Sequence, residues 1–328
     1  MQNTHIPSRT EIEHAAALLR AGKLVAFPTE TVYGLGANAL DAAAVARIFE
    51  AKGRPTTSPI IVHVCSMEMV RQAAAEWPPL AQILAQTFWP GPLTLVLRKQ
   101  AAVAALVTAG LETVGVRMPA HPVALALIEA ARIPIAAPSA NRFTQLSPTT
   151  AKHVRAGLGG RLDYILDGGP STVGIESTVL SLAEGVPVLL RPGGVPRQQI
   201  EAVIGPVTLL AKTPAEAHRS PGMHPRHYSP RTKLLLVRES EVPQVGAGAY
   251  LQLRHAPATE VREIVLMPVD AAEYAAQLYR TLHELDSRNY DWIAVDTPDD
   301  APEWEAIRDR LKRAAAAGED VSHQAESG

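Results

Sequence analysis

Residues 211–232 interrupt a chain that otherwise alternates short apolar runs with helical stretches. This segment, AKTPAEAHRSPGMHPRHYSPRT, holds four prolines and has no apolar period. Because proline fixes its own φ angle and lacks an amide hydrogen, the segment cannot continue a helix or a central strand. A length of 328 residues also corresponds to about two domains. We predict one domain over 1–210, an ordered linker over 211–232, a second domain over 233–317 and a disordered tail over 318–328.

The first domain should combine helices with a mixed sheet. Apolar spacing predicts helices over 11–21, 42–51, 67–76, 79–87, 121–131 and 149–156, with Thr10 capping the first of them. Apolar and β-branched runs predict strands over 24–27, 60–64, 93–97, 114–117, 133–136, 164–167, 177–181 and 186–191. Helices alternate with strands early, and strands dominate later. This order predicts an α/β or α+β domain on a mixed β-sheet.

Beyond the linker the same alternation returns on a smaller scale. Strands are expected over 234–237, 249–253, 264–267 and 292–296, and helices over 271–287 and 303–317. The pattern predicts a small, Rossmann-like α/β domain of three layers.

The composition excludes several classes of protein. The net charge is −2 and aromatic residues make up 5%, so the whole chain offers neither strong attraction for nucleic acid nor a broad base-stacking surface. Cys65 is the only cysteine, which excludes an intramolecular disulfide framework and a cysteine-rich zinc site. No run reaches about 18 apolar residues, and the polar start over 1–10 lacks a signal-peptide core. We therefore expect a soluble, cytoplasmic protein.

Polar side chains gather where the predicted strands begin or end. PTETVYGLG (28–36) follows the first strand, Arg117 ends a short one, PSAN (138–141) follows the strand at 133–136, and Arg191 ends another. Ligands bind at such strand ends in open α/β sheets, so these residues together predict one pocket for an anionic ligand. Taken singly, each stretch is also explained by a polar turn.

Lys52 and Arg54 form a basic pair in the sequence KGRP, directly after a predicted helix. The Arg fork and the Lys point charge can converge on a polyphosphate, although basic residues also stabilise helix C-termini. The chain has no GxxxxGK[ST], no GxGxxG that opens a helix, no HExxH and no GxSxG. These absences argue against the common nucleotide-binding loops, a paired-histidine metal site and a serine nucleophile.

Seven motifs in a fixed order make the chain similar to a known family. They are PTETVYGLG, KGRP followed by IIVHV, FWPGPLT, VRMP, PSANRF, GGPSTVGIESTV and LRPGG. In this order they resemble the YrdC-like family of threonylcarbamoyl-adenylate synthases, and the resemblance spans residues 10–317. The PGM…HYSP linker and the trailing α/β domain look like the long, two-domain form of that family.

The resemblance implies a twisted mixed β-sheet with a concave pocket for the first domain. It also implies a reaction and its partners. L-threonine, bicarbonate or CO₂, and ATP would give L-threonylcarbamoyladenylate, pyrophosphate and water, for the threonylcarbamoyl modification of adenosine 37 in tRNA. The threonine amine would form a carbamate that attacks the α-phosphorus, so positioning and charge neutralisation suffice without an enzyme nucleophile. Mg²⁺ would be held mainly by phosphate oxygens and water. Downstream tRNA threonylcarbamoyl-transferase proteins would consume the product.

The resemblance also implies roles for individual residues, matched motif by motif. Threonine would be bound by Thr31, His63, Arg117, Ala137 and Ser177, with Arg117 on its carboxylate. ATP would be bound by Lys52, Arg54, Ser58, Thr113, Ser139, Asn141, Ser147, Arg191 and Tyr228. Lys52 and Arg54, on the triphosphate, are the implied catalytic residues, and no residue is implied as a metal ligand.

Two positions depart from the family pattern. Ser58 stands where a longer polar residue is expected, which weakens the case for an ATP contact there. In the linker, His224 and Pro225 follow Met223 where the family often has Lys and an aromatic residue. Any cationic contribution from His224 would therefore depend on pH.

Residues 220–230 are too basic, aromatic and proline-rich for a passive spacer. We predict that Tyr228, with Arg226 and His227 beside it, folds over the ATP site and excludes water from the labile intermediate. A rigid strut that only sets the spacing of the domains is the alternative.

Three other functions fit parts of the pattern. An RNA-binding module would show weak, salt-dependent RNA affinity, but the net charge and the few aromatic residues argue against it. Carbamoyl transfer in hydrogenase maturation uses a similar domain beside Cys-rich zinc motifs, which a single cysteine argues against. A regulatory nucleotide binder with a lost active site is disfavoured because Lys52, Arg54, Ser139, Asn141 and Arg191 are all present.

Overall fold

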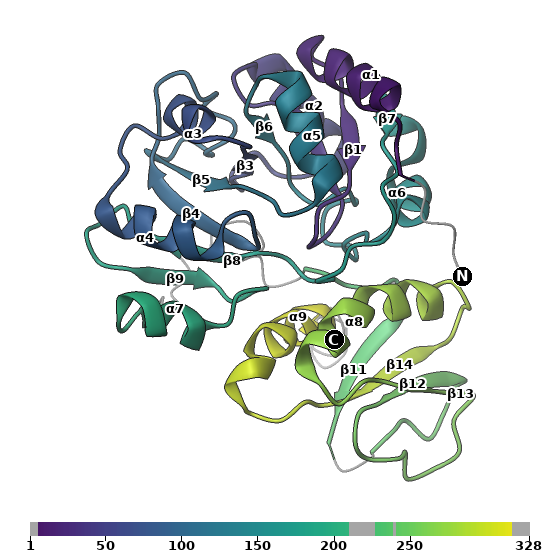
Figure 1. Cartoon of the computed structure of the whole chain (residues 1–328). Coiled ribbons are helices and arrows are strands. Elements are labelled where there is room, and N and C mark those ends of the chain that lie inside the picture. The colour runs from purple at the N-terminus through teal and green to yellow at the C-terminus, as the bar shows by residue number, and fades with distance from the viewer. Residues whose placement is uncertain (1–5, 210–226, 239–240, 317–328) are drawn as a thin grey trace, which may run out of the picture. The chain divides into compact units, whose positions relative to one another are not determined.

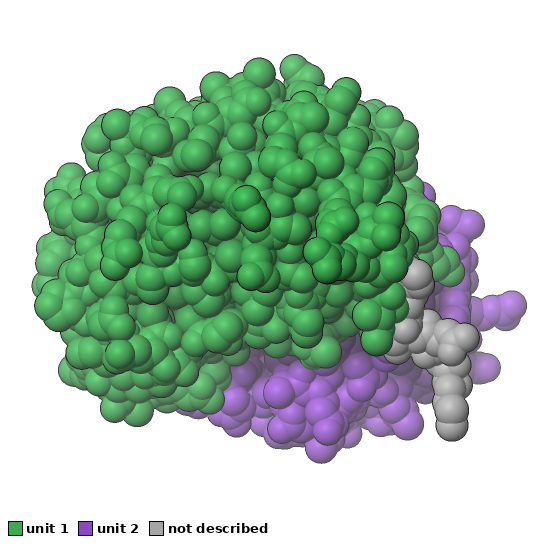
Figure 2. Space-filling view, turned by 45° about the horizontal axis from the view of Figure 1, so that its top comes forward, with its two compact units in different colours: residues 1–143, 147–223 green, residues 144–146, 224–328 purple. Residues whose placement is uncertain are grey.

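The computed structural model describes residues 6–209, 227–238 and 241–316. Contacts within the chain divide it into two units, which Figure 2 colours separately. The first unit comprises 1–143 and 147–223, and the second comprises 144–146 and 224–328. Most of the expected linker, with Arg226 and His224, and the tail over 318–328 lie outside the described residues. The two units are described one at a time.

A sheet of ten strands forms the first unit (Figure 1). Its strands are β1 (Val25–Phe27), β2 (Gly34–Asn38), β3 (Ile61–His63), β4 (Leu93–Arg98), β5 (Thr113–Arg117), β6 (Ile135–Ala136), β7 (Tyr164–Ile165), β8 (Thr178–Ser181), β9 (Val188–Arg191) and β10 (Thr208–Leu209). They lie in the order β10-β9-β8-β4-β5-β3-β6-β2-β1-β7. Parallel pairs such as β3–β5 and β4–β8 alternate with antiparallel pairs such as β4–β5. The sheet is therefore mixed, as the order of elements predicted.

Helices pack on this sheet through small and branched apolar residues. They are α1 (Arg9–Arg20), α2 (Ala42–Lys52), α3 (Met67–Ala73), α4 (Pro79–Phe88), α5 (Pro122–Ala131), α6 (Ala151–Leu158) and α7 (Arg197–Ile204), with a 3₁₀ turn, η1, at Gly159–Arg161. Figure 1 shows α1 and α5 side by side, and the contacts between them agree. Ala15, Leu19, Leu127 and Ile128 are fully buried along these two helices.

The start of the first helix corrects the expectation for Thr10. Ser8 is the N-cap: its hydroxyl accepts from the Glu11 amide, and the Glu11 carboxylate accepts from the Ser8 amide. This reciprocal capping box satisfies two amides that the helix itself cannot pair, so it fixes the start two residues earlier. The spacing Ser-x-x-Glu was present in the sequence as the signal.

Strand β2 was not expected, because residues 28–36 read as a polar turn. Glycine weakens strands in isolation, but here β2 pairs antiparallel with β1, with Phe27 opposite Gly34. A Cβ on Gly36 would lie 2.9 Å from the Phe27 ring and 3.2 Å from the Val25 carbonyl oxygen. Glycine is therefore required by the close packing of β1 on β2. Helix α7 and strand β10 were likewise not predicted.

The register of the sheet sorts residues onto two faces. Val62, Leu95 and Val116 point to one face and are fully buried in the core with the helices. His63 pairs with Arg117, and Val179 pairs with both Thr94 and Arg191. Directly paired residues share a face, and alternate residues of one strand do as well. The polar side chains therefore lie on the opposite face from the apolar core.

The second unit is built on a parallel sheet of four strands. They are β11 (Lys233–Val237), β12 (Gly248–Gln252), β13 (Glu263–Leu266) and β14 (Trp292–Asp296), in the order β11-β14-β12-β13. The helices are α8 (Ala271–Asp286) and α9 (Glu305–Ala315), with a 3₁₀ turn, η3 (Pro302–Trp304), before α9. The short segment 144–146 also belongs to this unit, because the Ser229 amide donates to the Thr144 carbonyl at 2.9 Å.

The expected three layers of the second unit are wrong for its described part. Figure 1 shows α8 and α9 on the same side of the sheet, and Tyr274 of α8 meets the ring of Trp304 at 5.3 Å. Loops cover the other face, where Trp292 Nε1 donates to the Val245 carbonyl and the Tyr250 hydroxyl donates to the His255 carbonyl. The connections after β11 and β12 each contain a proline, Pro243 and Pro257, which disfavours a helix.

Among the helices that the structure describes, none is both long and apolar enough to cross a membrane.

Candidate functional site

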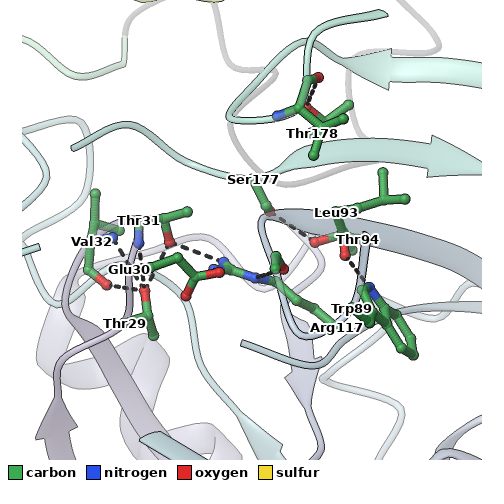
Figure 3. A network of polar contacts seen from close by, with 12 residues as sticks. Thr29, Glu30, Thr31, Val32, Trp89, Leu93, Thr94, Arg117, Ser177 and Thr178 are labelled. Carbon is green, nitrogen blue, oxygen red and sulfur yellow. Dashed lines mark hydrogen bonds and ion pairs between the residues drawn. The ribbon is translucent and has the colours of Figure 1, made fainter. Parts of the chain in front are cut away.

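Arg117 is held at the end of β5 by groups from two other segments, the turn at 30–31 and the turn at Gly91 (Figure 3). Its side chain is only 4% exposed. Nε donates to the Gly91 carbonyl at 3.2 Å, Nη1 donates to the Thr31 hydroxyl at 3.0 Å, and Nη2 lies 2.6 Å from Glu30 Oε1. A Cβ on Gly91 would lie 2.2 Å from the Phe88 carbonyl oxygen, so only glycine allows this turn to reach the guanidinium. The cation is thus fixed in position by the fold itself.

The turn between β1 and β2 forms a directed chain of hydroxyls. Thr29 Oγ1 donates to the Val32 carbonyl at 2.6 Å and lies 2.8 Å from Thr31 Oγ1. Because the Thr29 proton is used on Val32, the Thr31 hydroxyl donates to Thr29 while it accepts from Arg117. The Thr31 hydroxyl is therefore both oriented and polarised, and one lone pair remains for a further donor.

Ser177, Thr94 and Arg191 form a second polar cluster on the same face of the sheet. The hydroxyls of Ser177 and Thr94 lie 2.8 Å apart, and Arg191 Nη2 reaches the Ser177 carbonyl at 2.8 Å and its hydroxyl at 3.3 Å. A Cβ on Gly193 would lie 2.3 Å from the Ser177 carbonyl carbon, so the chain after β9 can approach Ser177 only as glycine. Figure 3 shows the Thr94–Ser177 pair and the Thr29–Thr31 turn on opposite sides of Arg117.

Lys52, at the end of α2, is a cation buried without a carboxylate among its hydrogen-bond partners. Its Nζ donates to the carbonyls of Ser139 at 2.6 Å and Asn141 at 2.5 Å, and the residue is 3% exposed. Burial, and then the positive charge of Arg54, hold the pKa of Lys52 well below its usual range. A bound anion would relieve both effects.

Arg54 follows the αL glycine that ends α2. Its Nη2 donates to the Ser58 hydroxyl and to the Pro59 carbonyl at 3.0 Å, and the guanidinium lies 5.9 Å from the centre of the Phe143 ring. Ser58 therefore contacts Arg54 directly. A short hydroxyl at this position orients the guanidinium of Arg54.

His63 is 4% exposed and lies beside Arg117 in the sheet. Burial, and then the nearby Arg117 cation, lower the pKa of His63 to about 3. The imidazole is therefore neutral near pH 7. Among the described residues, its buried Nδ1 has no hydrogen-bond partner.

The other residues predicted from the resemblance lie around these clusters. The Ser147 hydroxyl donates to Glu176 Oε1 at 2.5 Å, and the Ala137 amide donates to the Ile61 carbonyl at 2.9 Å. Thr113 lines a small hollow over the middle of the sheet, together with Thr94, Gly115 and Val179.

Tyr228 is described as part of the second unit. It has a positive φ of 62° and is 1% exposed. Its ring meets that of His227 at 4.0 Å and that of Tyr279 at 6.0 Å, and the Arg310 guanidinium lies 5.0 Å from its centre. The closing role predicted for Tyr228 stays a prediction.

Several residues of the site were missed or given no role by the reasoning from sequence. Glu30 and Thr29 stood in a stretch that was singled out, but neither was assigned a function. Thr94 stood in FWPGPLT, which read as structural. Trp89 of that stretch does act structurally, since its Nε1 donates to the Leu93 carbonyl at 2.7 Å.

In the described part of the chain, no group of three or more His, Cys, Asp or Glu side chains is arranged to hold a metal ion.

Comparisons with known proteins identify the family of the chain. A family model described as "Telomere recombination" matches residues 17–193, and one described as the C-terminal domain of threonylcarbamoyl-AMP synthase matches residues 195–316. The two models match successive parts of the chain and together cover most of it.

Relatives that match nearly the whole chain identify the same family. A threonylcarbamoyl-AMP synthase of Pyrococcus abyssi is 42% identical over 93% of this chain and 94% of its own length. One of Bacillus subtilis is 44% identical over 93% of each chain. The crystal structure of P. abyssi Sua5 complexed with L-threonine has a TM-score of 0.86 at 41% identity, over 95% of this chain and 96% of that chain. The chain belongs to the threonylcarbamoyl-AMP synthase family.

Proposed function

We propose that this chain is an L-threonylcarbamoyladenylate synthase, a nucleotidyltransferase that uses L-threonine, bicarbonate or CO₂, and ATP. The observation that carries the proposal is identity of 42–44%, over nearly the whole chain, to proteins named threonylcarbamoyl-AMP synthase. The products would be threonylcarbamoyl-AMP and pyrophosphate, for the modification of adenosine 37 in tRNA. The geometry of the first unit supports this reaction in two places.

The group around Arg117 suits an amino acid. A guanidinium donates charge-assisted hydrogen bonds to a carboxylate, and the contacts of Arg117 fix the orientation of its guanidinium. Thr31, His63 and Ser177 add oriented hydroxyls and a neutral imidazole on the same side of the sheet, which suit the hydroxyl of threonine. Ala137 would supply apolar contact for its methyl group.

The group around Lys52 and Arg54 suits a triphosphate. Two cations on one short turn neutralise the charge that develops when the α-phosphorus is attacked and pyrophosphate leaves. Ser139, Asn141, Ser147 and Arg191 would complete the nucleotide site, with Thr113 beside the hollow over the sheet. Mg²⁺, a hard cation that prefers oxygen ligands, would be held through phosphate oxygens and water.

The remaining assignments rest on the sequence. Tyr228 would close over the nucleotide, downstream tRNA threonylcarbamoyl-transferase proteins would receive the product, and the cytoplasm is the expected location. Comparing Tyr228→Phe with Tyr228→Ala tests the first of these, since only loss of the ring should increase futile ATP hydrolysis relative to product.

Pyrophosphate release from ATP, measured with and without L-threonine and bicarbonate, tests the proposed function. We expect release that requires both co-substrates, with threonylcarbamoyl-AMP identified by its mass. Pyrophosphate release that ignores threonine would contradict the proposal. Salt-dependent RNA binding without ATP turnover would favour the RNA-binding alternative instead.

A further inference from the structure

Glu30 is a buried carboxylate with unfilled hydrogen-bonding capacity. It lies between β1 and β2 and is 6% exposed, and its backbone is fixed because the Val173 amide donates to its carbonyl at 2.7 Å. Oε1 lies 2.6 Å from Arg117 Nη2. Among the described residues, neither carboxylate oxygen accepts a directed hydrogen bond. An ionised carboxylate offers about four acceptor positions, so most of its capacity is unused.

A buried carboxylate with so few hydrogen bonds lowers the stability of the fold unless another interaction offsets the lost hydration. Burying a carboxylate is unfavourable even when it is paired, and hydrogen bonds to its remaining lone pairs normally offset part of the cost. Arg117 has its other two nitrogens on the Gly91 carbonyl and the Thr31 hydroxyl. Glu30 therefore adds a negative charge to a guanidinium that the surrounding backbone and hydroxyl already orient.

Charge balance identifies the ligand that fits this pair. A zwitterionic α-amino acid carries one positive and one negative group on the same carbon, and the Glu30–Arg117 pair carries the same two charges. Such a ligand can enter with its carboxylate on Arg117 and its ammonium on Glu30, and every buried charge then faces an opposite one. A ligand without an ammonium would leave two anions beside one cation.

We propose that Glu30 binds the α-ammonium of the amino-acid substrate while Arg117 binds its α-carboxylate. The inference rests on the proposed function, which supplies L-threonine as the substrate. Glu30 would thereby select amino acids over hydroxy acids of the same shape. His121 is a further titratable group affected by the charge of Glu30, which raises the pKa of His121 against a larger lowering by burial.

Two ligands and two variants test the proposal by calorimetry on the full chain. The ligands are L-threonine and 2,3-dihydroxybutanoate of matching stereochemistry, in which a hydroxyl replaces the amine. The variants are Glu30→Gln and the control Glu13→Gln, whose side chain is 56% exposed in α1. Loss of one hydrogen bond to a charged group should weaken L-threonine binding about 10- to 150-fold in Glu30→Gln. Binding of 2,3-dihydroxybutanoate should change by less than about 3-fold, and Glu13→Gln should match the unmodified chain for both ligands.

Equal loss of both ligands in Glu30→Gln would overturn the proposal, because Glu30 would then only orient Arg117. Retention of both would overturn it as well. If Glu30→Gln does not fold, the unmodified chain decides: it should bind L-threonine at least about 10-fold more tightly than the hydroxy acid, and equal affinities refute the inference. If either refuting result is found but pyrophosphate release still depends on threonine, the inference about Glu30 is wrong and the proposed function still holds. Absence of both threonine binding and pyrophosphate release contradicts the two together.

Discussion

Two buried cations of the first unit, Arg117 and Lys52, have opposite electrostatic surroundings. Arg117 is paired with Glu30, so its neighbourhood is neutral before any ligand arrives. Lys52 donates to two neutral carbonyls, and the charge that acts on its pKa is another cation, Arg54. A neutral neighbourhood favours a ligand without net charge, and an uncompensated positive one favours a polyanion. The difference matches a zwitterionic amino acid at one place and a triphosphate at the other.

Stability should show the largest difference between the two cations. Arg117→Met leaves Glu30 buried without an opposite charge and should lower the free energy of unfolding by about 3–5 kcal/mol. Lys52→Met removes a desolvated cation and should cost less than about 2 kcal/mol, mostly through the two carbonyls that lose a donor. Urea denaturation of the full chain measures both. The double variant Glu30→Gln, Arg117→Met should recover part of the loss, and equal costs for the two single variants would refute the comparison.

Catalysis should depend strongly on Lys52 and Arg54, the two neighbouring cations. Lys52→Met and Arg54→Ala each remove a charge-assisted contact to phosphate, so kcat/KM for ATP should fall about 10- to 150-fold in each. The affinity for L-threonine, measured without ATP, should stay within about 2-fold, because these residues lie outside the Arg117 group. Unchanged kcat/KM in both variants would remove the triphosphate from this part of the site.

Substrate choice sharpens the description of the Arg117 group. Serine lacks the methyl group, and the loss of its contact should raise the activation free energy by about 1–3 kcal/mol. The kcat/KM for serine should therefore be roughly 5- to 150-fold lower than for threonine. Valine lacks the hydroxyl that Thr31, His63 and Ser177 are placed to recognise, and it should be rejected more strongly. Similar kcat/KM values for threonine, serine and valine would mean that the amino acid binds elsewhere.

A smaller effect concerns protons at Lys52. Its lowered pKa means that the free chain carries fewer protons there than a solvated lysine, and a bound triphosphate should raise the pKa again. ATP binding should therefore take up protons. The affinity should fall with rising pH by at most about 1.4 kcal/mol per pH unit. Calorimetry at about pH 8 in buffers of different ionisation enthalpy measures the uptake, since phosphate protons with a pKa near 6 are then already lost. If the Lys52→Met variant takes up the same number of protons on binding ATP, the protons bind to a group other than Lys52.

Much of the fold could be predicted from periodicity alone. Helices such as α2 and α5 and strands such as β4 and β14 lie within a residue or two of the expected ranges, because their apolar spacing matches their burial. Strand β2 could not be predicted, since Gly34 and Gly36 have low strand propensity and gain their pairing only beside β1. The number of layers in the second unit could not be predicted either. Two parallel strands can be joined by a helix or by a loop, and either one can cover the face of the sheet.

The order of the seven motifs by itself determined the family, and through the family it predicts Arg117, Lys52 and the other residues assigned to threonine and ATP. Residue identity and local spacing carry this information, and no tertiary contact is needed to recognise it. Only the tertiary structure decided the charge partners. Arg117 and Thr31 lie 86 positions apart, and Lys52 meets the carbonyls of Ser139 and Asn141 across a similar separation. Contacts over such distances follow from strand order and register, which set which side chains share a face of the sheet.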